Sequence, residues 1–219
     1  MSDPAAPRPG PLAGVRVLEL GQLIAGPFST MMLAWFGADV IKVEPPEGGD
    51  PLRTWRHVHN GTALWWYAMA RNKRCVTADL RVEEGRDLVR RLVEHCDVVV
   101  ENFRPGRLEA WGLGYDDLKA INPRVIMTRI SGYGQTGPSA PRPGVAAVAE
   151  GVGGLRYGNG YPDRPPARAN LSLGDTIGGL HAVIGVLLAL HHRDGQGAGE
   201  GQMVDVALYE AIFNLMEST

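Results

Sequence analysis

A carboxylate at the start of a long apolar segment is the residue of this sequence best suited to covalent chemistry. Asp175 follows a loop rich in proline and glycine, and the apolar residues 176–192 follow it. An aspartate at a helix start commonly caps the free N–H groups of the first turn. A carboxylate beside glycines and backbone N–H groups is also open to a bulky electrophile and can form an acyl intermediate. The sequence therefore leaves two roles open for Asp175, a helix cap and a nucleophile.

A cluster of cations forms the second candidate site. Arg71, Lys73 and Arg74 lie within four residues, directly before an expected strand at residues 75–80. Guanidinium and ammonium groups bind nucleotide diphosphates well, whereas most such side chains are simply solvated. The cluster is therefore either a clamp for a polyanion or a solvated turn.

The remaining titratable residues show no pattern typical of a metal site. The six histidines and the two cysteines, Cys75 and Cys96, lack metal-ligand spacing. The sequence contains neither a P-loop nor G-x-G-x-x-G at its first expected strand–helix turn. We therefore expect no metal and no phosphate-binding loop of these two kinds.

Alternating strands and helices are predicted to position these side chains. Short runs rich in β-branched residues predict strands at residues 15–20, 39–44, 75–80, 97–102, 124–130 and 202–206. Apolar or amphipathic runs predict helices at residues 28–36, 83–96, 176–192 and 207–216, with a weaker one at 144–155. The alternation indicates an α/β fold with a Rossmann-like, mostly parallel sheet flanked by helices. Ligands of such sheets bind outside the carboxyl ends of the strands.

The composition suits a globular protein with a substantial core. Of its 219 residues, 44% are hydrophobic and 21% are charged. The formal net charge of -2 gives no reason to expect nucleic acid or an anionic membrane as a partner. Residues 1–11 are expected to be a disordered lead-in, and the apolar run at 180–190 is too short to span a membrane. With its two cysteines, this composition indicates a cytoplasmic protein.

The order of several short motifs resembles the family III CoA-transferases over nearly the whole chain from Leu12. The matching stretches are LAGVRVLEL at 12–20, AGP at 25–27, GADVIKVEP at 37–45, NKR at 72–74, ENFRPG at 101–106, GYGQTGP at 132–138, LGD at 173–175 and VDVALYE at 204–210. Each motif is weak alone, and their shared order carries the resemblance.

The resemblance implies a mechanism and a set of ligand contacts. Asp175 falls on the family's nucleophile, which attacks an acyl-CoA thioester and passes CoA to a carboxylic acid through an aspartyl anhydride and an aspartyl-CoA thioester. Coenzyme A enters as part of the substrate. The positions that match CoA-binding segments of the family are Gln22, Leu23, Ile24 and Ala25, then Asn72, Lys73 and Arg74, and then Asn102 and Phe103. A family arginine falls on Ala110, and Arg104 or Arg107 is a candidate replacement.

The resemblance also bears on the substrate. Residues 149–166 look most like members that move CoA between succinyl-CoA and C4 or C5 dicarboxylic acids such as malate or citramalate. Arg156, Arg164 and Arg168 are candidates for binding the distal carboxylate. The family's α-methylacyl-CoA racemases place a His-Asp pair where this chain has residues 144–147, which hold no titratable group. Because proton transfer needs such a group, a transferase is favoured over a racemase.

Family members are roughly twice as long and form interlocked homodimers. The resemblance therefore implies that residues 12–219 are the N-terminal part of the large CoA-binding domain, without the second domain and the C-terminal return. Two hypotheses follow. The chain is either the CoA-binding and catalytic half of a transferase, or a non-catalytic remnant that binds CoA or a partner half.

Overall fold

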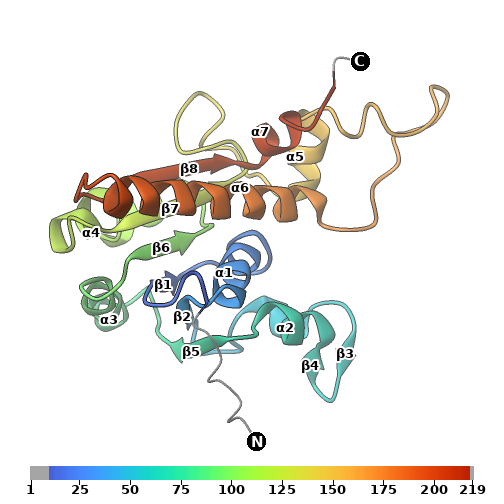
Figure 1. Ribbon diagram of the computed structural model, residues 1–219. Coiled ribbons are helices and arrows are strands. Elements are labelled where there is room, and N and C mark those ends of the chain that lie inside the picture. Colours follow the sequence, from blue (N-terminus) through green and yellow to red (C-terminus); the bar gives the residue numbers. More distant parts are fainter. Residues whose placement is uncertain (1–9, 218–219) are drawn as a thin grey trace, which may run out of the picture.

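The computed structural model describes residues 10–217, which form a six-stranded sheet with helices on both faces (Figure 1). The strands are β1 (Arg16–Glu19), β2 (Asp39–Glu44), β5 (Lys73–Thr77), β6 (Val98–Glu101), β7 (Ile126–Ser131) and β8 (Met203–Ala207). Their order across the sheet is β5-β2-β1-β6-β7-β8, and every neighbouring pair is parallel. This confirms the expected α/β class. The order is that of a doubly wound sheet, with its switch point between β1 and β6.

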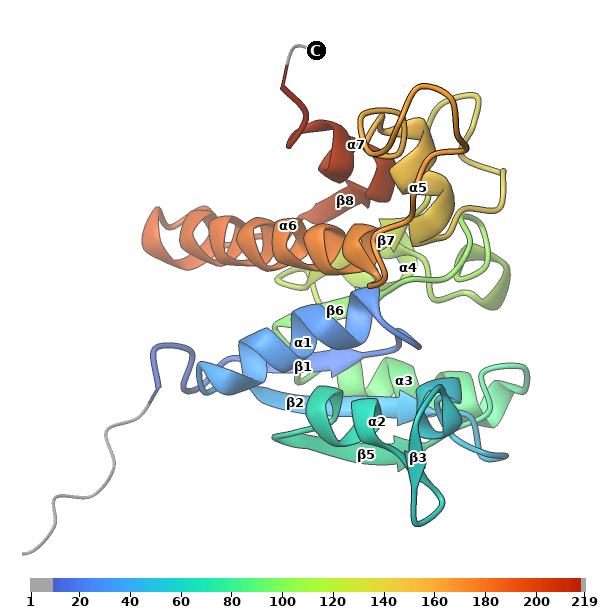
Figure 2. The same ribbon diagram turned by 90° about the vertical axis from the view of Figure 1, so that its right-hand side faces the viewer.

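The helices divide between the two faces of the sheet. They are α1 (Ala25–Trp35), α2 (Leu64–Met69), α3 (Glu83–Val93), α4 (Tyr115–Ile121), α5 (Ala146–Val152), α6 (Leu173–Leu190) and α7 (Leu208–Phe213). Helices α1 and α6 cover one face, and α3 and α4 cover the other (Figure 2). Alternate strand residues supply the two cores, as where Val17 packs toward α1 and α6 while Leu18 packs toward α3 and α4.

Glycines let α6 pack closely against its neighbours. A Cβ at Gly178 would lie 2.4 Å from a methyl carbon of Leu208, and one at Gly185 would lie 2.5 Å from Val204. With the π-helical turn at His191–Gly195, the helix is long and apolar enough to cross a membrane by length and composition alone. This corrects the expectation that the apolar run is too short. Half of the helix's most apolar stretch is buried in this fold, mainly against α1, α7, β7 and β8, which is typical of a core helix.

Several element boundaries differ from the sequence prediction. Strand β2 has the predicted bounds, whereas β5 begins at Lys73 rather than at residue 75, and α6 begins at Leu173 rather than at residue 176. A short hairpin, β3 (Val58–His59) with β4 (Thr62–Ala63), precedes α2 in a region without a predicted element. Most of the expected lead-in, residues 1–9, lies outside the described residues. Its end is packed, because the Cα of Gly10 closely approaches the backbone of α1's C-terminal turn.

Candidate active site

Asp175 lies half-buried in the first turn of α6, in the wall of a cavity of about 200 Å³. Ser172 is the N-cap of this helix, so the predicted start of the helix after Asp175 is wrong. Within residues 10–217, the Asp175 carboxylate makes no hydrogen bond, and it does not cap the first turn. The geometry therefore gives this carboxylate no structural partner and leaves it facing the cavity.

The surroundings of Asp175 favour its protonated form. Burial, and to a smaller extent the nearby negative charge of Glu150, raise the pKa of Asp175 from 3.8 to about 6 against the opposing charge of Arg168. Glu150 is itself fully buried, where it accepts a hydrogen bond from Arg156 at 3.1 Å and a longer one from the Gly174 N–H at 3.4 Å. A carboxylate with this pKa is still ionised at neutral pH, and it is more basic and so more nucleophilic than a solvated aspartate.

The cavity lies at the carboxyl ends of β1, β6, β7 and β8, where a doubly wound sheet is expected to bind its ligand. Loops after these strands meet the start of α6 there. The lining residues are Leu23, Ile24, Ala25, Trp55, Asn102, Phe103, Arg104, Pro105, Ile130, Ser131, Gly132, Arg142, Gly144, Val145, Asp175 and Leu208. The structure thus brings the expected residues Leu23, Ile24, Ala25, Asn102, Phe103 and Arg104 together with Asp175.

Two loops at the switch point are joined by a pair of hydrogen bonds. The Gln22 N–H donates to Oδ1 of Asn102, and Nδ2 of Asn102 donates to the Gln22 carbonyl, both at 2.8 Å. The next residue, Leu23, has a left-handed backbone with φ of 65°, which is uncommon for a side chain of this kind. Its N–H donates to the Asp50 carboxylate at 3.0 Å. These contacts hold the β1–α1 loop in one conformation.

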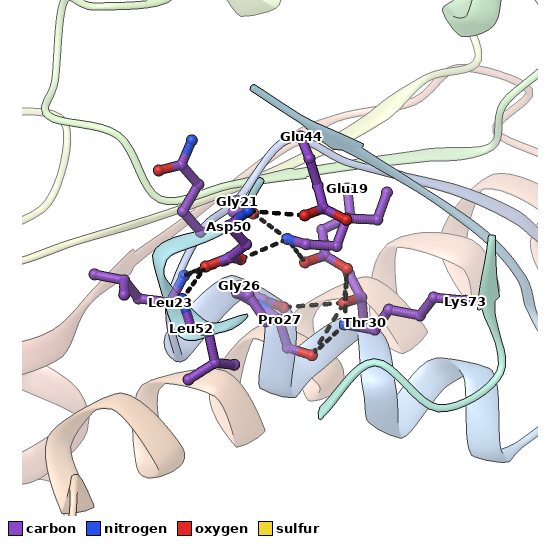
Figure 3. Close-up of polar contacts among 12 residues, drawn as sticks. Glu19, Gly21, Leu23, Gly26, Pro27, Thr30, Glu44, Asp50, Leu52 and Lys73 are labelled. Atoms are coloured by element: carbon purple, nitrogen blue, oxygen red, sulfur yellow. Dashed lines mark hydrogen bonds and ion pairs between the residues drawn. The ribbon is translucent and has the colours of Figure 1, made fainter. Parts of the chain in front are cut away.

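A buried cluster of charged side chains holds the start of that loop in place (Figure 3). Lys42 Nζ lies 2.7 Å from Glu19 and 2.8 Å from Asp50, and it donates to the Gly21 carbonyl at 2.8 Å. Lys73 Nζ lies 2.8 Å from the other oxygen of Glu19. Burial alone would raise the pKa of Glu19, but the two lysines outweigh it and lower the pKa to about 2. Glu19 is therefore ionised at neutral pH, and the contacts of Lys42 with Glu19, Asp50 and the Gly21 carbonyl fix the backbone next to Gln22.

Asn72, Lys73 and Arg74, the expected cationic clamp, do not line the cavity beside Asp175, and their contact with CoA stays a prediction. The Lys73 side chain is 0% exposed and is already paired with Glu19. Arg74 pairs with Asp39 at 2.5 Å, at the amino ends of the strands and thus at the edge opposite the cavity. Asn72 occupies the exposed turn before β5, with φ of 61°. None of the three residues therefore lines a cavity at the carboxyl ends of the strands.

A second cavity, of about 280 Å³, lies beside the first at the carboxyl ends of β2 and β5. Phe103 lines both cavities, and Gln22 lines the second. Leu80, Arg81 and Trp111 also line it, and sequence reasoning missed all three. The predicted strand at residues 75–80 begins two residues later than β5. Leu80 therefore falls inside the predicted strand, whereas in the structure it lies in the loop after β5. The other candidate arginines lie elsewhere, since Arg156 pairs with Glu150 and Arg164 stacks on Tyr161.

Histidine, cysteine, aspartate and glutamate side chains form no group of three suited to a metal within residues 10–217. Both cysteines are free thiols.

A doubly wound α/β protein with an unpartnered carboxylate at its ligand crevice is suited to acyl transfer through a covalent intermediate. The chain belongs to CoA-transferase family III, which matches residues 12–219. Over its whole length it is 54% identical to the succinyl-CoA–D-citramalate CoA-transferase of Chloroflexus aurantiacus, of which it covers 54%. It is 50% identical to the beta subunit of the succinyl-CoA–L-malate CoA-transferase of that organism, with 93% of this chain and 50% of the relative covered.

A solved structure shows the same fold. The crystal structure of a CAIB/BAIF family protein from Brucella suis matches with a TM-score of 0.89 and 44% identity, covering 95% of this chain and 56% of that one. The chain thus spans about half the length of the curated relatives it matches.

Proposed function

We propose that this chain is the CoA-binding and catalytic part of a CoA-transferase that moves CoA from succinyl-CoA to a C4 or C5 dicarboxylic acid. The observation that carries the proposal is the Asp175 carboxylate, which faces the cavity without a structural hydrogen bond and has a pKa raised to about 6. The names of the relatives, which pair succinyl-CoA with citramalate or malate, support the choice of acids.

The two cavities together suit a long, bent substrate. In this proposal the nucleotide end of CoA occupies the cavity with Arg81 and Trp111, and the pantetheine arm passes Gln22 and Phe103. The thioester then reaches Asp175 in the other cavity. Arg81 now pairs with Asp79 on the surface, and a guanidinium there is well placed to bind a phosphate group. Arg104 follows Phe103 and is proposed as a further CoA contact.

The proposed exchange proceeds in four balanced steps at Asp175. A carboxylate oxygen attacks the thioester carbonyl, the C–S bond breaks, and CoA leaves as a thiolate from an aspartyl acyl anhydride. The thiolate attacks the aspartyl carbonyl and releases the first acid, which leaves an aspartyl-CoA thioester. The acceptor carboxylate displaces CoA to form a second anhydride. The thiolate then takes up the new acyl group and frees Asp175.

The exposed side of α6 supports a larger assembly. Leu180, Ile184, Leu187 and Leu188 are exposed along this helix, and Phe213 is exposed on α7. An apolar surface of this kind is typical of an interface. We propose that in the cytoplasmic enzyme it packs in an interlocked homodimer, as the family resemblance implies. Light scattering coupled to size-exclusion chromatography tests this, and a strictly monomeric active enzyme contradicts it.

The alternative is a remnant that binds CoA without turnover. An exchange assay separates the two hypotheses. The protein is incubated with succinyl-CoA and citramalate, malate or acetate, and the CoA esters are separated by chromatography. We expect citramalyl-CoA or malyl-CoA from the wild type and none from Asp175→Asn. Binding of CoA without any new ester contradicts the transferase proposal and supports the remnant.

A further inference from the structure

Arg142 is an exposed cation at the rim of the Asp175 cavity, and neither the catalytic nor the CoA-binding proposal uses it. It lines the same cavity as Asp175, and it forms no ion pair with the residues from 10 to 217. The two ends of the loop that carries Arg142 approach each other closely, since a Cβ on Gly132 would lie 2.5 Å from the Cα of Gly144. The Arg142 N–H also donates to the Ser139 carbonyl at 2.9 Å. The backbone of Arg142 is thereby held close to the end of β7.

Ser131, the last residue of β7, provides a second and independent observation. It lines the cavity and is only 7% exposed, and its Oγ has no hydrogen-bond partner among the residues that the structure describes. Buried hydroxyl groups are rarely left unpaired in folded proteins. The Oγ is itself almost fully covered, so it donates to a ligand oxygen only after the Ser131 side chain turns toward the cavity.

We infer that Arg142 and Ser131 form a subsite for the distal carboxylate of a dicarboxylic acyl group, and that this subsite makes the enzyme prefer dicarboxylic over monocarboxylic substrates. The inference rests on the proposed transferase function. A guanidinium together with a hydroxyl matches the oxygens of a carboxylate. The cavity volume of about 200 Å³ leaves room for a C4 or C5 acyl group.

The other arginines near Asp175 fit this role less well. Arg156 is paired with the buried Glu150, and Arg164 lies over the ring of Tyr161. Arg168 lowers the Asp175 pKa by its charge, but it does not line the cavity. Arg104 follows Phe103, which separates the two cavities and lies on the proposed path of CoA.

The subsite acts on both half-reactions, because the donor acyl group and the acceptor acid occupy the same place in turn. Succinyl-CoA carries its own distal carboxylate, so the donor also depends on Arg142. A monocarboxylic pair, such as butyryl-CoA with acetate, depends only on Asp175 and the CoA contacts. The comparison of these two pairs isolates the distal carboxylate from the rest of the reaction.

The test measures kcat/KM with the protein at its natural length for both substrate pairs. Arg142→Ala is expected to lower kcat/KM for succinyl-CoA with citramalate by about tenfold to a hundredfold, as expected for a lost charge-assisted hydrogen bond. The value for the monocarboxylic pair should change by less than about twofold. Arg142→Lys should recover part of the dicarboxylate activity, and Ser131→Ala should show a smaller loss of the same selectivity. Arg91→Ala, on the exposed side of α3, is the matched control for removing one surface arginine.

Three outcomes overturn the inference while the proposed function stands. Equal loss on both substrate pairs shows a general role of Arg142, and no loss on either pair shows no role. If Arg168→Ala selectively loses kcat/KM for the dicarboxylic pair and Arg142→Ala does not, the distal carboxylate is bound by Arg168 instead. Absence of exchange in the wild type with every acid contradicts the proposed function itself, and titration of CoA with each variant confirms that the binding site is folded.

Discussion

Replacing the proposed nucleophile is expected to stabilise the folded protein. Asp175 has a folded-state pKa of about 6 against an ordinary value of 3.8, mainly because it is buried. A raised pKa means that the folded state prefers the protonated form, so wild-type stability falls as the pH rises from about 4 to about 6. Above that range the ionised side chain costs folding free energy. Asp175→Asn removes this cost, because the amide is neutral and nearly the same size.

The magnitude follows from the pKa shift. Two pKa units correspond to about 3 kcal/mol, and the half-buried position beside an open cavity reduces this through solvent screening to about 1 to 2 kcal/mol. The gain should be complete at pH 8, where the aspartate is ionised in both states. At pH 5 the folded wild type is mostly protonated, and the gain should fall to about half of its value at pH 8.

Urea unfolding at pH 8 and pH 5 measures this difference. The wild type, Asp175→Asn and the control Asp163→Asn are compared, since Asp163 is exposed on a loop. The control should show no comparable gain. If Asp175 capped the helix, its replacement would weaken the first turn and lower the free energy of unfolding at pH 8. A loss of stability at pH 8 therefore refutes the assignment of a carboxylate without a structural role.

Three more predictions concern the supports of the site. Glu150→Gln removes a negative charge near Asp175, so the acid limb of the kcat/KM profile should move to lower pH by up to about one unit; an unchanged limb argues against the electrostatic coupling. Asn102→Ala removes both hydrogen bonds to Gln22 and should raise KM for acyl-CoA about tenfold with a smaller change in kcat, and an equal effect on both constants in steady-state kinetics would contradict a positioning role. Lys42→Met leaves buried carboxylates uncompensated and should cost about 3 to 5 kcal/mol in urea unfolding, whereas a cost below about 1 kcal/mol would show that the cluster does not hold the fold.

The sequence predicted the parallel sheet because its strands are short, β-branched and regularly separated by helices. Strand β2 is a clear case, since both of its ends coincide with the prediction. Strand β5 was misplaced because Lys73 and Arg74 are typical of a turn. The structure buries Lys73 through an ion pair with Glu19 on β1, and a contact so distant in the chain leaves no local signal.

The candidate site was predictable only in part, for the same reason. The LGD motif and the glycines after it identified Asp175, and the motif around Asn102 identified the loop that borders the cavity. Arg81 and Arg142 lie in loops without periodicity, where an arginine usually means a solvated surface. Only the packing of the loop ends against the sheet edge brings these two side chains to the cavities.

Trapping the covalent intermediate tests the central claim most directly. The protein is mixed with succinyl-CoA, hydroxylamine is added, and the masses of the peptides that contain Asp175 are measured. An aspartyl hydroxamate is expected at Asp175 in the wild type and none in Asp175→Asn. Exchange of CoA between acids with Asp175 left unmodified, or a hydroxamate on another carboxylate, would contradict the central claim.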